Sequence, residues 1–457
     1  EWTKFADGKA NLEIATMPSI DFGGAFAFVE SYAHYCTEQL SSRAMYMLYA
    51  RRFLDENERL RAEKALPKLL KAIASRQLSE GGFTYWPGHT GVHDWATSMV
   101  GEVMTEARRQ GFAVSRQCYD RWKKYQNDAA RRYRHTTDRA ADLQQAYRLY
   151  TLALAGEEPA AAMNKLRESK SLSGQALLRL AAAYAVVGRK DVASKLVGRI
   201  DESTFVKGDY TTFWSPLRDQ AMALEAWVWT GNAEQAFSMA RKVSDKFSST
   251  CCSTQEVAFV SVAMSRLADL AKGAETEIAI EEPSKKPLLL CKFGGVKKLT
   301  IAPTSGSVTV ENRGMGELTA SLLTSRRPNA DETVAATAKG VTIEVHYTDL
   351  QGRRVNPDRL RQGEEFVAEI EVSKSGERSE SMALTYAVPS GWEIWNERLT
   401  RGAANTAADY VDIRDERIDW YFSLAAGKTE RFTVRLRAAY CGRFVLRPRV
   451  CEDLYDP

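Results

Sequence analysis

Cys36 and Gln39 are the residues of this chain whose types and spacing most directly suggest chemistry. Two residues three positions apart lie on one face of a helical turn. A thiolate held there beside a glutamine side chain can attack the amide, expel ammonia and leave an internal thioester. This thioester is an activated acyl group, and a lysine amine that opens it becomes covalently joined to the protein. The same spacing also suits a buried thiol beside a polar residue, so the surrounding sequence has to decide between the two interpretations.

The surrounding sequence resembles a known family in several separate places. Residues 36–39 read Cys-Thr-Glu-Gln and are followed by Ser42-Arg43, which is similar to the thioester signature of the alpha-2-macroglobulin family in its bacterial form. Further motifs follow in the family's order at residues 81–88, 95–97, 217–221, 253–256, 436–438 and 455–457. The resemblance covers nearly the whole chain, and several ordered motifs are more specific than one tetrapeptide.

This resemblance implies a function as well as a fold. Members of the family are endopeptidase inhibitors rather than enzymes: a protease cuts a bait segment, the molecule rearranges, and the exposed thioester captures the protease once. The resemblance therefore implies that Cys36 supplies the thiol and Gln39 the acyl carbon, that lysine amines of proteases are the partners, and that no cofactor is needed. It also implies a periplasmic or cell-envelope setting, a role in bacterial defence, and upstream macroglobulin-like domains, so that we expect a C-terminal fragment.

The residues around the predicted thioester carry further expectations. Tyr35 stands where family members usually have glycine, a residue that permits backbone geometries which a side chain resists. This departure keeps open a second interpretation, a thioester-less scaffold for protein–protein binding. Glu38 is adjacent to the predicted bond, and Tyr85 or Trp86 in the glycine-rich loop could shield it from water, although aromatic residues in such a loop also fill helical cores.

Two other kinds of site are compatible with the sequence. His89 and His93 follow the glycine-rich loop, and complement-type relatives use a histidine to pass the acyl group to hydroxyls, but surface histidines are the simpler interpretation. Glu38 and Glu256 leave open a toroid glycoside hydrolase, which would need two carboxylates converging on one pocket. Capping of helices or ion pairing is the plainer role for Glu256 and for the neighbouring Arg218-Asp219 pair.

Composition limits the remaining possibilities. The 457 residues have a net charge of +4 and are 44% hydrophobic, which is typical of globular domains and lacks the basic stripe of a nucleic-acid binder. No stretch is long and apolar enough to span a membrane. The seven cysteines lack Cys-x-x-Cys spacing and the five histidines are scattered, so no metal site is predicted. Cys441 and Cys451 flank an alternating stretch and could form a disulfide.

The hydrophobic pattern predicts a multidomain α plus β protein. Helical periodicity is clear at residues 66–78, 143–155, 175–187 and 221–230, whereas alternation predicts strands at 298–302, 307–312, 341–347, 366–372, 382–388, 418–422 and 432–437. The family resemblance makes the helical part an α/α toroid and the β-strand segment after it part of a split β-domain, followed by a C-terminal β-sandwich. The expected boundaries are 1–20 for the first half of the split β-domain, 21–272 for the toroid with the thioester, 273–330 for the second half, and 331–457 for the macroglobulin-like sandwich.

Overall fold

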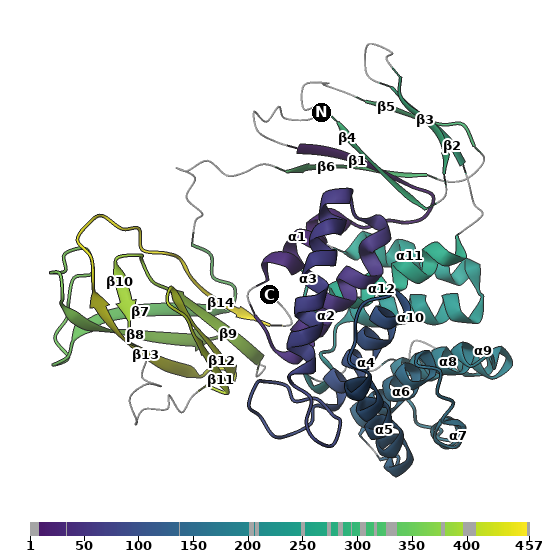
Figure 1. Cartoon of the computed structure of the whole chain (residues 1–457), viewed down its shortest axis with the longest axis horizontal. Helices are drawn as coiled ribbons and strands as arrows, with labels where there is room; N and C mark the ends of the chain where they lie inside the picture. The colour runs from purple at the N-terminus through teal and green to yellow at the C-terminus, as the bar shows by residue number, and fades with distance from the viewer. Residues whose placement is uncertain are drawn as a thin grey trace. The chain divides into compact units, whose positions relative to one another are not determined.

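The computed structural model of the chain divides into two compact units, residues 1–330 and 331–457. The first unit contains the helices and two small sheets, and the second is formed of strands (Figure 1). The structure describes residues 9–32, 34–136, 138–200, 205, 210–247, 252–271, 276–281, 287–293, 295–301, 308–314, 318–325, 336–375, 380–395 and 408–454. The expected boundaries at residues 272–273 and 330–331 lie outside the described residues.

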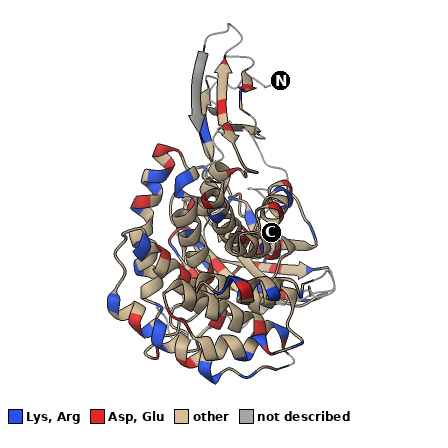
Figure 2. Cartoon of the chain, turned by 90° about the vertical axis from the view of Figure 1, so that its right-hand side faces the viewer, with Lys and Arg blue, Asp and Glu red and all other residues tan. Residues whose placement is uncertain are grey.

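The helical part begins after one strand and runs to residue 270. Its helices are α1 (Phe22–Ser31), α2 (Thr37–Tyr49), α3 (Glu56–Ala74), α4 (Asp94–Arg109), α5 (Arg116–Arg132), α6 (Arg139–Leu154), α7 (Ala160–Arg167), α8 (Gly174–Val186), α9 (Lys190–Val197), α10 (Pro216–Thr230), α11 (Ala233–Lys246) and α12 (Thr254–Leu270), with short 3-10 turns η1 (Ala50–Phe53) and η3 (Tyr210–Thr212). Lys and Arg are interspersed with Asp and Glu over the helices that face the viewer in Figure 2.

Six of these helices form an inner ring, in which α2, α4, α6, α8, α10 and α12 each contact the next and α12 contacts α2 again. Almost every residue of α2 and α8 is buried, whereas the outer helices α3, α5, α9 and α11 bury only one stripe. A helix covered on all sides has to be apolar or internally satisfied all round, which explains the two sequence patterns. The closed ring confirms the predicted α/α toroid.

The four inner helices around the candidate site all begin at the same end of the ring. The first turn of α2 contacts Thr254 and Gln255 at the start of α12 and residues 84–85 before α4, while its last turn and η1 contact the last turns of α4 and α12. Helices α10 and α12 begin with serine caps, Ser215 and Ser253. The toroid therefore has an N-terminal end, rich in backbone N–H groups, and a C-terminal end, rich in carbonyl groups.

The predicted helix boundaries differ from the structure most at α3, which runs from Glu56 to Ala74, and α10 begins at Pro216 rather than at residue 221. Apolar spacing predicted a helix over 66–78 with Pro67 near its start, but α3 begins at Glu56 and Pro67 lies in its interior. The first part of α3 is an exposed, charged surface with little apolar periodicity. Its start is marked instead by a capping box, in which Asp55 accepts from the Glu58 N–H and the Glu58 side chain accepts from the Asp55 N–H.

Two small antiparallel sheets complete the first unit, in the orders β4-β1-β6 and β3-β2-β5. Strand β1 precedes the helices in sequence but pairs with β4 and β6, which follow them. Leu12 and Ile14 of β1 pack against Ile278 and Ile280 of β2 in one apolar core. The strands are β1 (Lys9–Ala15), β2 (Thr276–Glu281), β3 (Pro287–Phe293), β4 (Val296–Ile301), β5 (Thr309–Asn312) and β6 (Thr319–Ser325). Strand pairing thus links segments on either side of the toroid, while the exact domain boundaries stay predictions.

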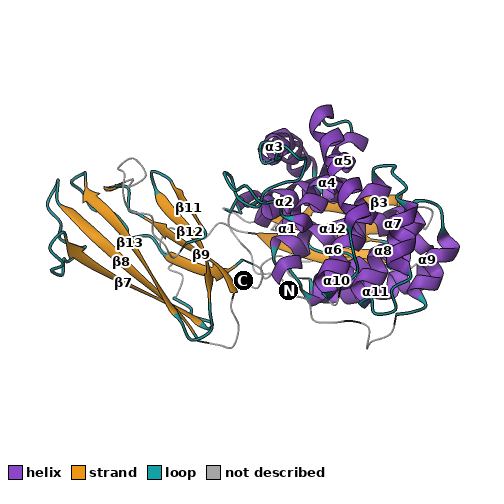
Figure 3. Cartoon of the chain, turned by 90° about the horizontal axis from the view of Figure 1, so that it is seen from below, coloured by secondary structure: helices purple, strands orange, loops and turns teal. Residues whose placement is uncertain are grey.

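The second unit is a β-sandwich, as the alternation predicted. Its two antiparallel sheets have the orders β10-β13-β8-β7 and β11-β12-β9-β14. Figure 3 labels β13, β8 and β7 of the first sheet and β11, β12 and β9 of the second. Side chains at alternate positions of both sheets, including Phe366, Leu384, Trp420 and Phe432, are buried in a common core. The strands are β7 (Val341–Asp349), β8 (Glu365–Lys374), β9 (Glu380–Ala387), β10 (Trp392–Ile394), β11 (Tyr410–Ile413), β12 (Arg417–Leu424), β13 (Thr429–Ala438) and β14 (Arg449–Asp453).

The suggested disulfide between Cys441 and Cys451 is wrong. Both are free thiols: Cys451 lies in β14 paired with Leu384, whereas Cys441 is exposed and donates to the Gln362 side chain. Within the described ranges, no helix combines the length and the apolar character that crossing a bilayer requires, and no group of three or more His, Cys, Asp or Glu side chains is placed to hold a metal ion.

Candidate functional site

Cys36 and Gln39 meet at the first turn of α2, where they form a reciprocal capping box. Cys36 is the N-cap, with extended backbone angles, and its sulfur accepts a hydrogen bond from the Gln39 N–H at 3.4 Å. The Gln39 side-chain oxygen Oε1 in turn accepts from the Cys36 N–H at 3.0 Å. Serine or threonine usually fills the N-cap of such a box. Here the box places a thiol and a primary amide side by side in one rigid turn.

Water is excluded from this pair. The side chains of Cys36 and Gln39 are both 0% exposed. The Gln39 nitrogen Nε2 is buried and has no hydrogen-bond partner among the described residues. Leaving a buried amide N–H unsatisfied costs about 1–3 kcal/mol. Loss of this nitrogen as ammonia would remove that cost while leaving the bonded oxygen Oε1 in place.

The thiol is a weak acid in this environment. Burial, followed by the nearby Glu38 carboxylate, raises the pKa of Cys36 to about 12. A hydrogen bond from the Tyr85 hydroxyl, the Gln39 N–H and the positive charge of Arg76 act in the opposite direction but are smaller. A free Cys36 thiol would therefore be protonated and unreactive at neutral pH, because the thiolate is the nucleophilic form.

The tyrosine that departs from the family pattern does not strain the turn. Phe213 is the non-glycine residue with a positive φ in the described part of the chain, so the Tyr35 backbone lies in an ordinary region. The Tyr35 ring is half-buried, and the Arg43 guanidinium lies over it, 5.5 Å from the ring centroid. The backbone before Cys36 in this structure therefore does not require glycine.

Glu38 is a buried polar link between α2 and α12 rather than a group aimed at a pocket. Its carboxylate accepts from Ser42 at 2.5 Å, from the Gln255 amide at 3.2 Å and from Thr254 at 3.3 Å. Burial raises the pKa of Glu38 to about 7 against these three hydrogen bonds. Gln255 also accepts from Trp95 at 3.0 Å, which extends the link to α4. These contacts fix the first turn of α2 within the ring.

The glycine-rich loop is anchored directly on the first turn of α2. The Thr37 N–H donates to the Tyr85 carbonyl at 2.9 Å, and the Thr37 hydroxyl donates to the Thr84 carbonyl at 2.6 Å. Arg76 adds bonds at 3.3 Å to the Thr37 hydroxyl and to the Tyr85 carbonyl. The loop can approach the helices this closely because Gly81 has φ +105°, and a Cβ there would lie 2.4 Å from a backbone oxygen of α5.

An aromatic cluster surrounds the Tyr85 ring. His93 stacks on it with centroids 4.9 Å apart, Phe213 lies 6.0 Å away in a nearly parallel plane, and the buried Trp86 meets it edge-on at 5.3 Å. Phe213 has φ +50°, a conformation that is uncommon for a bulky residue and that packing must hold in place. Tyr85 and Trp86, the residues that the sequence suggested as a shield, thus lie in one cluster next to the thiol.

Neither histidine is placed to accept an acyl group. His93 is the N-cap of α4, and its Nδ1 accepts from the Ala96 N–H at 3.2 Å. Burial lowers the pKa of His93 to about 4, so the ring is neutral with its Nδ1 lone pair occupied. His89 is exposed on the loop. Direct attack by an amine is therefore the chemistry that this arrangement supports.

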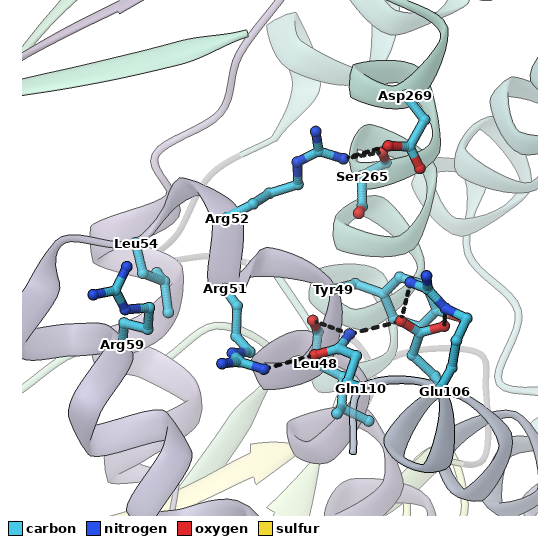
Figure 4. Close-up of a pocket in the computed structure, with 11 residues that line it drawn as sticks. Leu48, Tyr49, Arg51, Arg52, Leu54, Arg59, Glu106, Gln110, Ser265 and Asp269 are labelled. Atoms are coloured by element: carbon cyan, nitrogen blue, oxygen red, sulfur yellow. Dashed lines mark hydrogen bonds and ion pairs between the residues drawn. The ribbon is translucent and has the colours of Figure 1, made fainter. Parts of the chain in front are cut away.

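A cavity at the C-terminal end of the toroid bears on the hydrolase alternative (Figure 4). It measures about 510 Å³ and is lined by residues of α2, η1, α3, α4 and α12. Its two carboxylates are already engaged, since Asp269 pairs with Arg52 at 2.7 Å and Glu106 pairs with Arg109 at 2.5 Å. A glycosidase needs one carboxylic acid and one carboxylate free to face the sugar. The cavity does not provide that pair.

Comparison with known proteins agrees with the resemblance seen in the sequence. Residues 340–457 match the bacterial alpha-2-macroglobulin MG10 domain. Alpha-2-macroglobulins from Xylella fastidiosa strain Temecula1 and Escherichia coli K12 are 24% and 22% identical over 98% and 100% of the chain. Over nearly its whole length the chain resembles the bacterial alpha-2-macroglobulins. It spans 30% of the length of each of these two relatives.

Solved structures give the same fold. Native alpha-2-macroglobulin from Escherichia coli, spanning the residues from domain MG7 to the C-terminus, matches 98% of the chain with a TM-score of 0.81 at 17% identity, and the match covers 75% of that protein. Salmonella alpha-2-macroglobulin reacted with methylamine matches 99% of the chain, and 31% of its own length, with a TM-score of 0.80 at 19% identity. At these identities the likeness establishes the fold of the chain.

Several contributors to the site were not identified from the sequence. Thr37 and Arg76 hold the Tyr85 loop through backbone contacts, and Phe213 reaches the cluster from the turn before α10. Thr37 lies within the tetrapeptide and its hydroxyl could have suggested a bond to a neighbouring loop. Arg76 and Phe213 carry no local signal, because their roles depend on tertiary contacts.

Proposed function

We propose that Cys36 and Gln39 form an internal thioester and that the chain is part of an alpha-2-macroglobulin-like protease inhibitor. The observation that carries the proposal is the buried capping box, in which the Cys36 thiol and the Gln39 side chain share one helical turn and the Gln39 nitrogen Nε2 has no partner among the described residues. The Cys36 sulfur bonds to the Gln39 side-chain carbon and loses its proton, the carbon–nitrogen bond breaks, and the amide nitrogen takes up that proton and leaves as ammonia. Supporting context comes from the relatives named alpha-2-macroglobulin.

The same geometry supports capture of an amine. A lysine nitrogen attacks the acyl carbon, and the negative charge that develops on Oε1 is stabilised by the Cys36 N–H, which already donates to that oxygen at 3.0 Å. Departure of the sulfur regenerates the thiol and leaves an amide at residue 39. Because the acyl group is consumed, the reaction occurs once per molecule, which makes the protein a single-turnover covalent trap rather than an enzyme.

The physiological partners belong to the same proposal. Proteases, held through their lysine amines, are the targets, and further macroglobulin-like domains of the full-length protein would deliver them to the site. We place this activity in the periplasm or at the cell envelope, as a defence against foreign proteases. The packing of the Tyr85 and Trp86 rings beside the site supports a thioester that is protected from water until a target arrives.

Peptide mapping after treatment with methylamine tests the proposal. We expect a methylamide at residue 39 together with a newly alkylatable thiol at Cys36. A protease mixed with untreated protein should form a conjugate that survives denaturation, and prior methylamine treatment should prevent it. An unmodified Gln39 after methylamine treatment would rule out the covalent mechanism and leave a binding scaffold.

A further inference from the structure

The departing sulfur of the proposed thioester requires a proton. Burial, together with the nearby Glu38 carboxylate, raises the pKa of the Cys36 thiol to about 12. A thiolate released into this site would be much less stable than a thiolate in water, where cysteine has a pKa of about 8.5. Opening of the thioester should therefore be slow unless a neighbouring group protonates the sulfur as the carbon–sulfur bond breaks.

The Tyr85 hydroxyl is in direct contact with that sulfur, to which it donates a hydrogen bond. Glu38, the other acid near the thiol, affects it through its charge, and its two oxygens accept from Ser42, Gln255 and Thr254. Of the two remaining groups that affect the thiol, the Gln39 N–H is a backbone amide, and the Arg76 guanidinium bonds to the Thr37 hydroxyl and the Tyr85 carbonyl. Neither gives up a proton readily, because amides and guanidinium groups are far weaker acids than a phenol, whose ordinary pKa is about 10. Tyr85 is therefore the group that can protonate the departing sulfur.

The position of Tyr85 is fixed from both sides. Its carbonyl receives hydrogen bonds from the Thr37 N–H at 2.9 Å and from the Thr37 hydroxyl at 3.0 Å, which tie the residue to the same helical turn as the thiol. Its ring is held between His93 at 4.9 Å and Trp86 at 5.3 Å. Tyr85 keeps some exposure to solvent while Cys36 has none, so the phenol can contact an arriving amine as well as the sulfur.

We propose that Tyr85 is a catalytic residue of thioester opening, which passes a proton from the attacking amine to the Cys36 sulfur. The inference rests on the proposed thioester. The amine nitrogen bonds to the acyl carbon of residue 39, and the carbon–sulfur bond breaks with its electron pair going to sulfur. The Tyr85 hydroxyl proton moves to the sulfur, and the phenolate takes the excess proton from the new amide nitrogen. The products are a neutral amide, a neutral thiol and an unchanged phenol.

Tyr85→Phe separates proton transfer from shielding, because it keeps the ring and removes the hydroxyl. General acid catalysis typically contributes 10²–10⁴-fold, and sulfur is a fairly good leaving group, so we expect methylamine to open the thioester about tenfold to hundredfold more slowly. Spontaneous hydrolysis should not accelerate, because the phenyl ring still covers the bond. Tyr85→Ala should instead lose its thioester to water faster. The rates are followed by intact mass and by thiol release.

Tyr184→Phe is the matched control, since it removes a hydroxyl that donates to Asn164 at 2.8 Å between α8 and α7. It should leave the opening rate unchanged. Opening of Tyr85→Phe at the wild-type rate or faster would overturn the inference and reduce Tyr85 to a cover. If Tyr85→Phe arrives without a thioester, the wild-type protein decides: a slower reaction in deuterium oxide supports proton transfer, and equal rates rule it out. A wild-type protein that has not lost ammonia would instead refute the thioester itself.

Discussion

The two ends of the toroid are formed by the same helices yet have opposite chemistry. At the N-terminal end, the first turn of α2 is fully buried and is held by its own capping box, by the carbonyl groups of residues 84–85 and by Arg76. At the C-terminal end, the last turns of α2, α4 and α12 surround a cavity with arginines paired to carboxylates (Figure 4). Free N–H groups at one end favour an acyl oxygen, and free carbonyl groups at the other favour cations. The direction of the inner helices therefore decides at which end of the toroid acyl chemistry is possible.

Cys36→Ser is expected to have the largest effect on the chemistry of the N-terminal end. Serine is a preferred N-cap, so the capping box should persist. The free energy of unfolding should stay within about 1 kcal/mol of that of the wild-type protein in which Cys36 is a free thiol. Capture of methylamine should be lost completely, because an oxygen ester does not form from this amide. Intact mass and urea unfolding measure both quantities. Cys118→Ser, at a buried thiol of α5, is the control that should retain capture.

Glu38 makes the N-terminal end sensitive to pH. Because burial raises its pKa to about 7 from the usual 4.5, the folded protein binds this proton more tightly than the unfolded chain does. Stability therefore falls as pH rises from about 4.5 to about 7. The loss attributable to Glu38 approaches about 3 kcal/mol above pH 7. Glu38→Gln should flatten this part of the profile in urea unfolding at a series of pH values, and an unchanged slope would contradict the assignment.

Gly101→Ala tests how strongly the stability of the toroid depends on the packing of α4 against α5. Gly101 lies in the middle of α4, and a Cβ there would come within 1.8 Å of the Trp122 ring of α5. Because the ring would have to move in a close-packed interface, we expect a loss of about 1–3 kcal/mol in the free energy of unfolding. Gly91→Ala, where no atom lies within 4 Å of the added Cβ, should be nearly neutral. Equal effects of the two substitutions would show that the packing argument is wrong.

The smallest effect is expected at the C-terminal end. Arg52→Ala removes a partly exposed ion pair with Asp269, and such pairs contribute about 0.2–1 kcal/mol. The rate of methylamine capture should not change, because the substitution leaves the first turn of α2 untouched. A change in that rate comparable to the effect of Tyr85→Phe would mean that the two ends are coupled and that the chemistry does not depend on the N-terminal end alone.

Features that depend on residues close together in the sequence could be predicted, whereas features that depend on distant residues could not. The pairing of Cys36 with Gln39 depends on one helical turn, so spacing alone could place them together. The start of α3 was missed because its first turns have charged rather than apolar spacing, although the Asp55 and Glu58 capping box was readable. The positions of Tyr85 and Phe213 depend on loops closing over α2, which no local pattern encodes.

Whether the thioester between Cys36 and Gln39 exists can be read from the mass of the chain. Intact mass of the freshly folded, untreated chain should be lower than the sequence mass by one ammonia, and methylamine should then add one equivalent of the amine. A chain at its full sequence mass, with the Cys36 thiol free and the Gln39 amide intact, would contradict the account.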